Sequence, residues 1–449
     1  MPSQVRHIAK TFAHGIHPLE RKESTCSLPI RRLPFAPELI VPLSQHTGAP
    51  AVPCVNDGQE VVRGEPIAKA GGFVSVPMHA PATGVVTAIE RRLSAKGDMV
   101  RSIVIRTYMG ADQQVLFGAP QNIEAMSTEE LVQAVQDTGV VGLGGAAFPT
   151  HVKLAVPEGK RIDTVIVNGC ECEPYLTTDH RVMLEYPDDI HAGVQIVQKA
   201  VGAERTVIAT EDNKLDAAEA LQRSPRIAPT TSIAVLKTHY PQGAEKMITK
   251  VVLNREVPSG GLPSDVGVAV FNVATLAQLG ELLPKRQGLI ERVVTITGPG
   301  VAHPGNYLMA LGTPLSFALK HAGLRPDATE VIFGGPMMGP AVADPDVPIT
   351  KGITGILVLT EAETSRRPTK VYPCIKCGRC VEACPIHLNP SRLGLLAKSG
   401  LYETMETDFH LNDCFECGCC TYVCPSHIPL VQHFRVAKQM NRQRKAAKP

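Results

Sequence analysis

The fold of the C-terminal part is decided by the stretch Cys374-Ile375-Lys376-Cys377-Gly378-Arg379-Cys380-Val381-Glu382-Ala383-Cys384-Pro385. The same spacing recurs in Cys414-Phe415-Glu416-Cys417-Gly418-Cys419-Cys420-Thr421-Tyr422-Val423-Cys424-Pro425, 40 residues further along. Each run provides four thiols at matched positions, and thiolates are the soft ligands that select zinc or iron-sulfur clusters. Cys419 lies outside the shared spacing and is expected to be a spare thiol.

This spacing resembles the ligation pattern of bacterial ferredoxins, in which the fourth cysteine of each run binds the other of two clusters. The resemblance predicts one [4Fe-4S] cluster held by Cys374, Cys377, Cys380 and Cys424. It predicts a second cluster held by Cys414, Cys417, Cys420 and Cys384. Because such clusters exchange single electrons, the sequence predicts an electron-transfer protein.

Zinc is the first alternative, since paired C-x2-C spacing also builds zinc ribbons with four thiolates on one ion. A zinc ribbon leaves the third cysteine of each run and the trailing Cys-Pro unexplained, so the clusters are favoured. Disulfides are a weaker alternative. Residues 1–20 lack the apolar core of a secretory signal, and the thiols are expected to stay in the reducing cytoplasm.

The composition indicates a multidomain globular protein. At 449 residues the chain exceeds one typical core, and its length suggests about three domains. A formal net charge of +2 gives no indication of nucleic-acid binding. No apolar run reaches the ~18 residues that a spanning helix needs, so no transmembrane segment is expected. Any work at a membrane would be done by docking.

The expected fold class is multidomain α/β plus α+β, because strand-rich and alternating segments follow one another along the chain. The expected parts are a barrel-sandwich hybrid-like β domain (1–120), a Rossmann-like α/β domain (121–290), a β-grasp domain of the SLBB type (291–363), a two-cluster ferredoxin-type domain (364–434) and a basic tail (435–449). The segment 364–368 is expected to be a linker, and helical character is expected at 390–408, between the cysteine runs.

One hairpin in the first domain resembles that of biotinyl and lipoyl carrier domains. It spans residues 76–84, Val-Pro-Met-His-Ala-Pro-Ala-Thr-Gly. A carrier attaches its prosthetic group to a lysine at the hairpin tip, where this sequence has Met78, His79 and Ala80. The hairpin is therefore interpreted as a scaffold, and His79 as a structural or interfacial residue.

A glycine-rich loop, Gly142-Leu143-Gly144-Gly145-Ala146-Ala147-Phe148, precedes Lys153. Glycines let backbone N–H groups approach a phosphate and lysine adds positive charge, although such loops also serve in turns and packing. The strand expected at 164–167 leads into Asn168-Gly169-Cys170-Glu171-Cys172-Glu173. Polar side chains at the end of a parallel strand lie where open α/β sheets bind ligands, which favours nucleotide binding.

Together with the segments 240–245 and 271–276, these stretches resemble the NADH-oxidising flavoprotein subunit of respiratory complex I, in which they surround FMN. The resemblance implies FMN contacts by Gly144, Gly145, Lys153, Asn168, Gly243, Asn272 and Thr275. It implies contacts with the nicotinamide nucleotide by Phe148, Glu171 and Glu173, and it places Glu245 among the cofactor-binding residues. The sequence departs from that family at Leu143, Ala147, His151, Cys170 and Ala244.

From end to end the sequence is similar to the C subunits of Rnf ion-translocating electron-transport complexes. The similarity rests on the segments 15–18, 42–50, 79–81, 171–175 and 334–339, on the modified glycine-rich loop and on both cysteine runs. It implies that electrons pass between NADH, FMN and two [4Fe-4S] clusters, to or from partner subunits, coupled to Na⁺ or H⁺ transport. No side chain is expected to act as a covalent catalyst. The expected place is peripheral, on the cytoplasmic face of the inner membrane. The expected partners are membrane and peripheral subunits of an Rnf-type complex and a ferredoxin-like electron carrier.

Two other functions remain open from the sequence. One is a soluble flavin and iron-sulfur reductase that feeds a corrin or a ferredoxin, since a corrin reductase of propanediol metabolism shares the flavin and cluster parts. The other is an electron wire that holds clusters without flavin. The basic tail is interpreted either as solvated or as attracted to an anionic membrane face or an acidic partner; its charges are Arg435, Lys438, Arg442, Arg444, Lys445 and Lys448.

Overall fold

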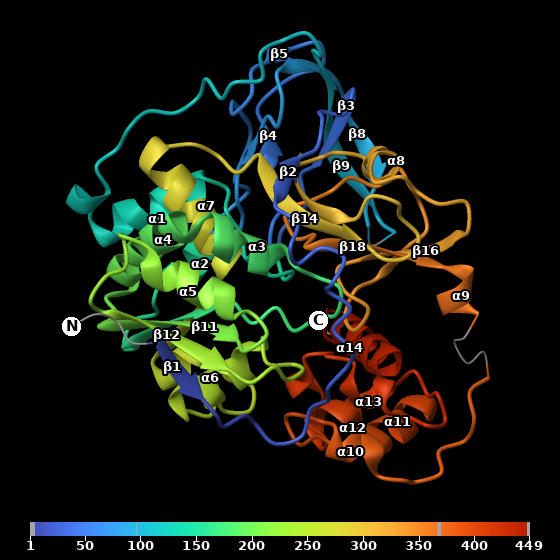
Figure 1. The fold of residues 1–449 in the computed structure, drawn as a ribbon. Helices are drawn as coiled ribbons and strands as arrows, with labels where there is room; N and C mark the ends of the chain where they lie inside the picture. Colours follow the sequence, from blue (N-terminus) through green and yellow to red (C-terminus); the bar gives the residue numbers. More distant parts are fainter. Residues whose placement is uncertain (1–4, 96, 366–369, 447–449) are drawn as a thin grey trace.

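The computed structural model describes residues 5–95, 97–365 and 370–446 (Figure 1). Its strands form sheets of five, six, four and three strands, and a helical domain lies at the end of the molecule opposite the four-stranded sheet (Figure 1). Residues 366–368 of the expected linker, and Lys448 of the expected tail, lie outside the described residues.

The five-stranded sheet is parallel throughout and has the order β1-β12-β11-β10-β13. Its strands read as near-continuous apolar runs because helices cover them, as is typical of parallel sheets. They are β1 (Val5–Ile8), β10 (Thr164–Asn168), β11 (Arg205–Glu211), β12 (Thr231–Leu236) and β13 (Val268–Asn272). Strand β1 pairs with β12, and so the start of the chain lies in this sheet rather than with the β domain that follows it in sequence.

The order of these strands creates a topological switch point between β10 and β13. Strands β11 and β12 follow β10 on one side, and the chain then crosses to the other side of β10 to form β13. Asn168 at the end of β10 is level with Asn272 at the end of β13. Open α/β sheets bind ligands outside the carboxyl ends of their strands at such a point.

The helices of this domain pack on the sheet and on one another (Figure 1). Helix α1 begins with a capping box at Ser127, as the sequence predicts. Helices α4 and α7 approach closely, since a Cβ on Gly280 would lie 1.9 Å from the carbonyl oxygen of Asp189. The helices are α1 (Thr128–Asp137), α2 (Thr150–Leu154), α3 (Thr178–Glu185), α4 (Pro187–Val201), α5 (Leu215–Arg223), α6 (Glu245–Leu253) and α7 (Val273–Leu282), with 3₁₀ turns η1 (Ile123–Ala125), η2 (Pro263–Val266) and η3 (Leu283–Lys285).

The N-terminal β domain consists of two small sheets. One has the order β3-β9-β8-β5 and the other β4-β6-β7. His79 in β7 is buried, and a Cβ on Gly288 would lie 2.1 Å from its ring, which is the packing expected of an interfacial residue. The strands are β3 (Glu38–Pro42), β4 (Val52–Pro53), β5 (Glu60–Val61), β6 (Pro66–Lys69), β7 (Met78–His79), β8 (Gly84–Leu93) and β9 (Met99–Thr107).

The six-stranded sheet has the order β17-β16-β18-β14-β15-β2. Its edge strand β2 (Ile30–Arg32) comes from the N-terminal part of the chain and pairs with β15. The other elements are β14 (Glu291–Thr297), β15 (Gly305–Ala310), α8 (Leu315–His321), β16 (Ala328–Phe333), β17 (Ala341–Val342), β18 (Gly355–Thr360) and α9 (Glu361–Thr364).

The helical domain carries both cysteine runs, and the helical insert expected between them is present as α11 and α12. Its helices are α10 (Arg379–Glu382), α11 (Pro390–Lys398), α12 (Tyr402–Thr407), α13 (Cys419–Tyr422) and α14 (Leu430–Ala446), with the 3₁₀ turn η4 (Leu411–Asp413). Within the described ranges, no helix is both long enough and apolar enough to cross a membrane.

The described residues 435–446 of the expected basic tail do not form a separate segment. They continue helix α14, and Phe434 and Ala437 are buried against the domain. Four of the basic side chains pair with carboxylates elsewhere in the same domain, and Arg442 is exposed. Arg435 and Lys438 contact Glu416 at 3.0 and 2.9 Å, while Arg444 pairs with Glu403 and Lys445 with Glu406.

Candidate functional site

Four loops meet at the switch point of the parallel sheet, and the hydrogen bonds between them join residues that are distant in sequence. The backbone N–H of Leu143 donates to Thr275 Oγ1 at 2.8 Å. Asn168 Nδ2 donates to the carbonyl oxygen of Gly243 at 2.7 Å. The structure thus brings the glycine-rich loop together with the loops after β10, β12 and β13, as the sequence predicts for a ligand site.

The glycines of this site leave room on one side and allow close approach on the other. Gly145 has φ +113°, a left-handed conformation that favours glycine, and a Cβ there would meet nothing within 4 Å. A Cβ on Gly144 would lie 3.3 Å from Asn272 Nδ2, and one on Gly243 would lie 2.4 Å from the carbonyl oxygen of Cys170. Gly145 therefore faces open space above a tightly packed floor.

Lys153 lies beside this floor, next to the end of β13. Its ammonium pairs with Glu245 and donates to the carbonyl oxygen of Val270 at 3.2 Å. Both side chains are partly exposed, at 32% and 44%. Lys153 thus brings a positive charge to the mouth of the site, and Glu245 is placed to hold it.

Asn272 organises the floor through both ends of its amide. Its Oδ1 caps helix α7 by accepting from the N–H groups of Ala274 and Thr275. Its Nδ2 donates to Asp179 Oδ2 at 2.6 Å. Burial, and then the charge of Glu171, raises the pKa of Asp179 to about 7.

The residues predicted to face the nicotinamide nucleotide have different surroundings. Phe148 is half-buried at the end of the glycine-rich loop. Glu171 is buried, and its carboxylate accepts from the N–H groups of Asp179 and His180 at 3.0 and 3.3 Å, at the start of α3. Glu173 Oε2 accepts from the N–H of Met337 at 3.1 Å, and burial raises the pKa of this carboxyl to about 7.

The site also contains buried polar atoms without a partner among the described residues, namely Glu173 Oε1, Asp179 Oδ1 and Gln242 Nε2. Buried polar atoms are usually hydrogen-bonded, so these three indicate the binding of a polar ligand. Together with the open space at Gly145 and the charge of Lys153, they suit a polar ligand that carries a negative charge, such as a phosphate.

Two buried cations that no local pattern reveals support these loops. Lys22 Nζ donates to the carbonyl oxygens of Glu171, Glu173 and Leu176, the first two at 2.8 and 3.0 Å. Arg292 on β14 donates to the carbonyl oxygens of Leu143 and Lys351. Burial lowers the pKa of both side chains, to about 10 for Arg292. Their roles depend on long-range contacts, which is why no motif in the sequence indicates them.

The eight cluster cysteines gather into two groups. Burial raises the pKa of Cys380, and the nearby thiols of Cys424, Cys374 and Cys377 raise it further. Burial likewise raises the pKa of Cys420, and the thiols of Cys414, Cys417, Cys384 and Cys380 raise it further, in that order. A small cavity is lined by the same second group, Cys384, Cys414, Cys417 and Cys420. The neighbours of each group thus include a cysteine of the other run, as crossed ligation requires. Among the described residues, no three of these side chains are already arranged to hold a metal ion.

The second group lies against the rest of the molecule. Tyr240, which is buried, donates from Oη to the carbonyl oxygen of Cys417 at 2.7 Å. Asp413, next to Cys414, accepts from Lys246 Nζ at 3.1 Å and from the N–H of Gly260 at 2.9 Å. We call the group with Cys417 the inner cysteine group and the group with Cys377 the outer cysteine group.

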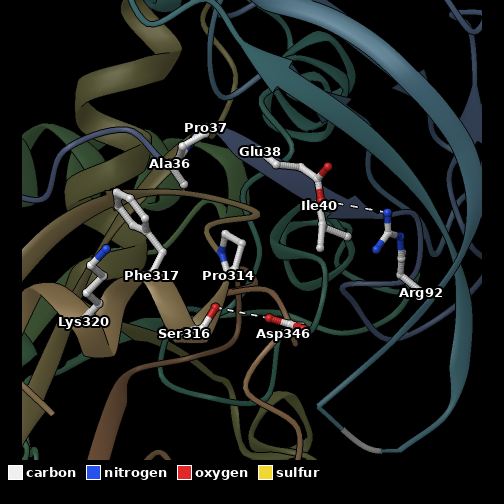
Figure 2. Close-up of a pocket in the computed structure, with 10 residues that line it drawn as sticks. All are labelled: Ala36, Pro37, Glu38, Ile40, Arg92, Pro314, Ser316, Phe317, Lys320 and Asp346. Atoms are coloured by element: carbon white, nitrogen blue, oxygen red, sulfur yellow. Dashed lines mark hydrogen bonds and ion pairs between the residues drawn. The ribbon is translucent and has the colours of Figure 1, made fainter.

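A cavity of about 430 Å³ lies elsewhere, between the N-terminal β domain and helix α8 (Figure 2). Arg92 lies 3.9 Å from Glu38 on its β-domain side, and Ser316 donates to Asp346 at 3.2 Å on the other. None of the predicted site residues lines it. The cavity is therefore separate from the loops at the switch point.

Comparison with known proteins fits this arrangement. Residues 10–109 match the RnfC barrel sandwich hybrid domain, 135–281 the Nuo51 FMN-binding domain, 293–341 the SLBB domain and 373–428 the 4Fe-4S dicluster domain. The C subunit of the proton-translocating ferredoxin:NAD(+) oxidoreductase complex of Clostridium ljungdahlii is 43% identical, over 96% of this chain and 94% of that protein. The chain belongs to the family of Rnf complex C subunits.

A second Rnf C subunit, from the Na(+)-translocating complex of Acetobacterium woodii, is 42% identical over 89% of this chain and 90% of its own length. An NAD+-reducing [NiFe]-hydrogenase shares the fold at a TM-score of 0.50 and 18% identity, over 72% of this chain and 64% of that one. The family matches confirm the predicted fold class and the predicted cofactors, FMN and iron-sulfur clusters. The FMN-binding match spans every predicted flavin residue, and the dicluster match spans all eight cysteines.

Proposed function

We propose that this Rnf C subunit is the electron-input subunit of an ion-translocating ferredoxin:NAD(+) oxidoreductase complex. It passes electrons between NADH, FMN and two [4Fe-4S] clusters, to or from partner subunits. The observation that carries the proposal is the position of the inner cysteine group, which Tyr240 joins directly to the loops of the flavin site. Its place is at the cytoplasmic face of the membrane, held there by membrane and peripheral subunits of the same complex.

FMN supplies the change between two-electron hydride chemistry and one-electron transfer when it is bound. The chain binds and orients it. Gly144 and Gly145 admit the ligand, Lys153 balances its phosphate charge, and Asn168, Gly243, Asn272 and Thr275 fix the surrounding loops. Phe148 and Glu173 face the nicotinamide nucleotide, and Glu171 acts through α3, whose first N–H groups it holds.

The proposed cluster ligands are the two cysteine groups, in agreement with the crossed spacing of the runs. Cys374, Cys377, Cys380 and Cys424 hold the outer cluster, and Cys414, Cys417, Cys420 and Cys384 hold the inner one. The proposed domains keep the predicted boundaries with two changes. Strands β1 and β2 of the N-terminal part join the neighbouring sheets, and residues 435–446 belong to the cluster domain as part of α14.

An anaerobic NADH titration tests the proposal. The chain is loaded with iron, sulfide and FMN, and the bleaching of its visible absorbance is followed as NADH is added. The proposal predicts bleaching of flavin and clusters, and a protein that NADH cannot bleach with FMN present would refute it.

A matched pair of lysine variants locates the flavin site. Lys153→Met is expected to weaken FMN binding by about tenfold, the effect of losing one charge-assisted contact. Lys250→Met serves as the control, because Lys250 lies on α6 and pairs with Glu256 at 2.8 Å. An unchanged FMN affinity in Lys153→Met would remove Lys153 from the site.

A further inference from the structure

The inner cysteine group is hydrogen-bonded to other domains, whereas the hydrogen bonds around the outer group stay inside the helical domain. The N–H of Tyr372 donates to the carbonyl oxygen of Ser426, and Ser426 Oγ donates to the carbonyl oxygen of Pro373. Within the described residues, the hydrogen bonds of 370–382 all stay inside the helical domain. Helix α10, which carries Cys380, lies at the lower tip of the molecule (Figure 1).

The segment that leads to Cys377 carries exposed apolar side chains. Cys377 itself is exposed, and Val371, Tyr372 and Ile375 are 48%, 48% and 67% exposed. Single exposed apolar residues are ordinary on protein surfaces, but three within six residues of one cluster cysteine are a local concentration. Apolar contact at the centre is what a protein partner needs to bring its own redox group close.

The same segment is also basic. Lys370, Lys376 and Arg379 are exposed, and among the described residues no carboxylate lies within ion-pair distance of any of them. Lys370 instead lies over the ring of Tyr372, 5.1 Å from its centroid. Glu382 is the one acidic residue between 370 and 382. We call the six residues Lys370, Val371, Tyr372, Ile375, Lys376 and Arg379 the outer rim.

We propose that the outer rim is the docking surface for an acidic one-electron carrier protein, which exchanges its electron at Cys377. The inference rests on the proposed function, because it assigns the exit of the route that begins at NADH. The basic side chains complement carboxylates around the carrier's redox centre, and such complementarity steers encounter and fixes orientation. Each encounter oxidises one partner and reduces the other by a single electron, and no bond is made or broken. A small, weak interface suits this exchange, since electron-transfer encounters are among the smallest protein interfaces.

Binding of two protein probes to the cluster-loaded chain tests the proposal. The first is an acidic plant-type ferredoxin and the second a basic cytochrome c of similar size, both measured by calorimetry or NMR titration at low salt. The ferredoxin is expected to bind more tightly than the cytochrome, and its affinity is expected to fall as ionic strength approaches ~0.1 M, where the Debye length is about 10 Å.

The double variant K376E/R379E is expected to weaken ferredoxin binding by at least about tenfold. Lys320→Glu on α8 makes the same kind of charge reversal at an exposed residue of another domain and should leave binding unchanged. If K376E/R379E loses iron, Lys370→Glu takes its place, because Lys370 lies outside the cysteine run.

Three results would overturn the proposal: equal binding of both probes, ferredoxin binding unchanged by the double variant, or equal weakening by Lys320→Glu. A shift of the outer cluster's potential in K376E/R379E without a change in binding would also overturn it, since the cations would then only balance cluster charge. The proposed function is tested apart from this, because NADH bleaching needs no carrier protein.

Discussion

The two cysteine groups have the same spacing and opposite surroundings. The inner group is closed in by contacts of Tyr240, Met337 and Lys246 from other domains, whereas the outer group ends at the exposed Cys377. Spacing decides what the cysteines can ligate, and the surroundings decide where the electron comes from and where it goes. A sequence repeat therefore does not imply equal roles.

The largest expected effect comes from breaking the crossed ligation. Cys384→Ala should lower the iron content from about eight to about four per chain. It should leave Cys414, Cys417 and Cys420 open to alkylation, as read by mass spectrometry. Cys424→Ala is the matched variant and should expose Cys374, Cys377 and Cys380 instead. Exposure of the cysteines from the same run as the substituted one would show that the ligands do not cross.

Lys22→Met removes the buried ammonium that supports the loop after β10. This loop belongs to the flavin site and so lies on the side of the inner cysteine group. The variant leaves three buried carbonyl oxygens without their donor. Leaving such groups unsatisfied costs about 2 kcal/mol, which corresponds to a Tm lower by about 4–8 °C in calorimetry. Lys237→Met, at an exposed position, is the control. A Tm equal to that of the control would mean that Lys22 does not stabilise the loop.

Glu173→Gln tests the inner side of the molecule through the pH dependence of stability, because Glu173 lies between the flavin loops and the inner cysteine group. Its folded-state pKa of about 7 is above the ordinary value of 4.5, and the cause is burial. The ionised carboxylate is therefore unfavourable in the folded state. As pH rises from about 4.5 to 7 the wild type should lose stability relative to the variant, and the difference should level off above pH 7. Parallel Tm measurements from pH 5 to 8 check this, and a difference that is constant with pH would contradict it.

The smallest expected effect is that of Tyr240→Phe. The variant removes the hydrogen bond to the carbonyl oxygen of Cys417. Without its donor, the carbonyl oxygen of Cys417 places more negative charge near the inner cluster. The reduction potential of that cluster should therefore fall by at most a few tens of millivolts, while that of the outer cluster stays unchanged. Potentiometric EPR titration separates the two. Equal shifts of both potentials would mean that Tyr240 acts on the domain as a whole.

The features that can be predicted from the sequence are those whose residues lie close together along the chain. The cysteine runs, the capping box at Ser127 and the glycine-rich loop are patterns within a few residues, and each lies where the pattern predicts. That Asn168 and Asn272 lie in one site is predicted by the resemblance to a known family. In the structure, the strand register places the two residues level.

The residues that sequence reasoning misses act at long range. Lys22 is buried under a loop about 150 residues away, and Arg292 reaches the glycine-rich loop from another sheet. The helical course of the expected tail is missed for the same reason, because its partners Glu403, Glu406 and Glu416 lie 19 to 41 residues away. No periodicity or motif within a segment records a partner that only the fold supplies.

The order of the two clusters is the central claim, and a matched pair of ligand variants tests it most directly. Cys417→Ala removes the inner cluster and Cys377→Ala, its counterpart in the other run, removes the outer one. Each variant is loaded with FMN, and the remaining cluster is followed by EPR after NADH and then after dithionite. The inner cluster of Cys377→Ala should be reduced by NADH, whereas the outer cluster of Cys417→Ala should be reduced only by dithionite. Equal reduction of both by NADH, or the reverse order, would contradict the account.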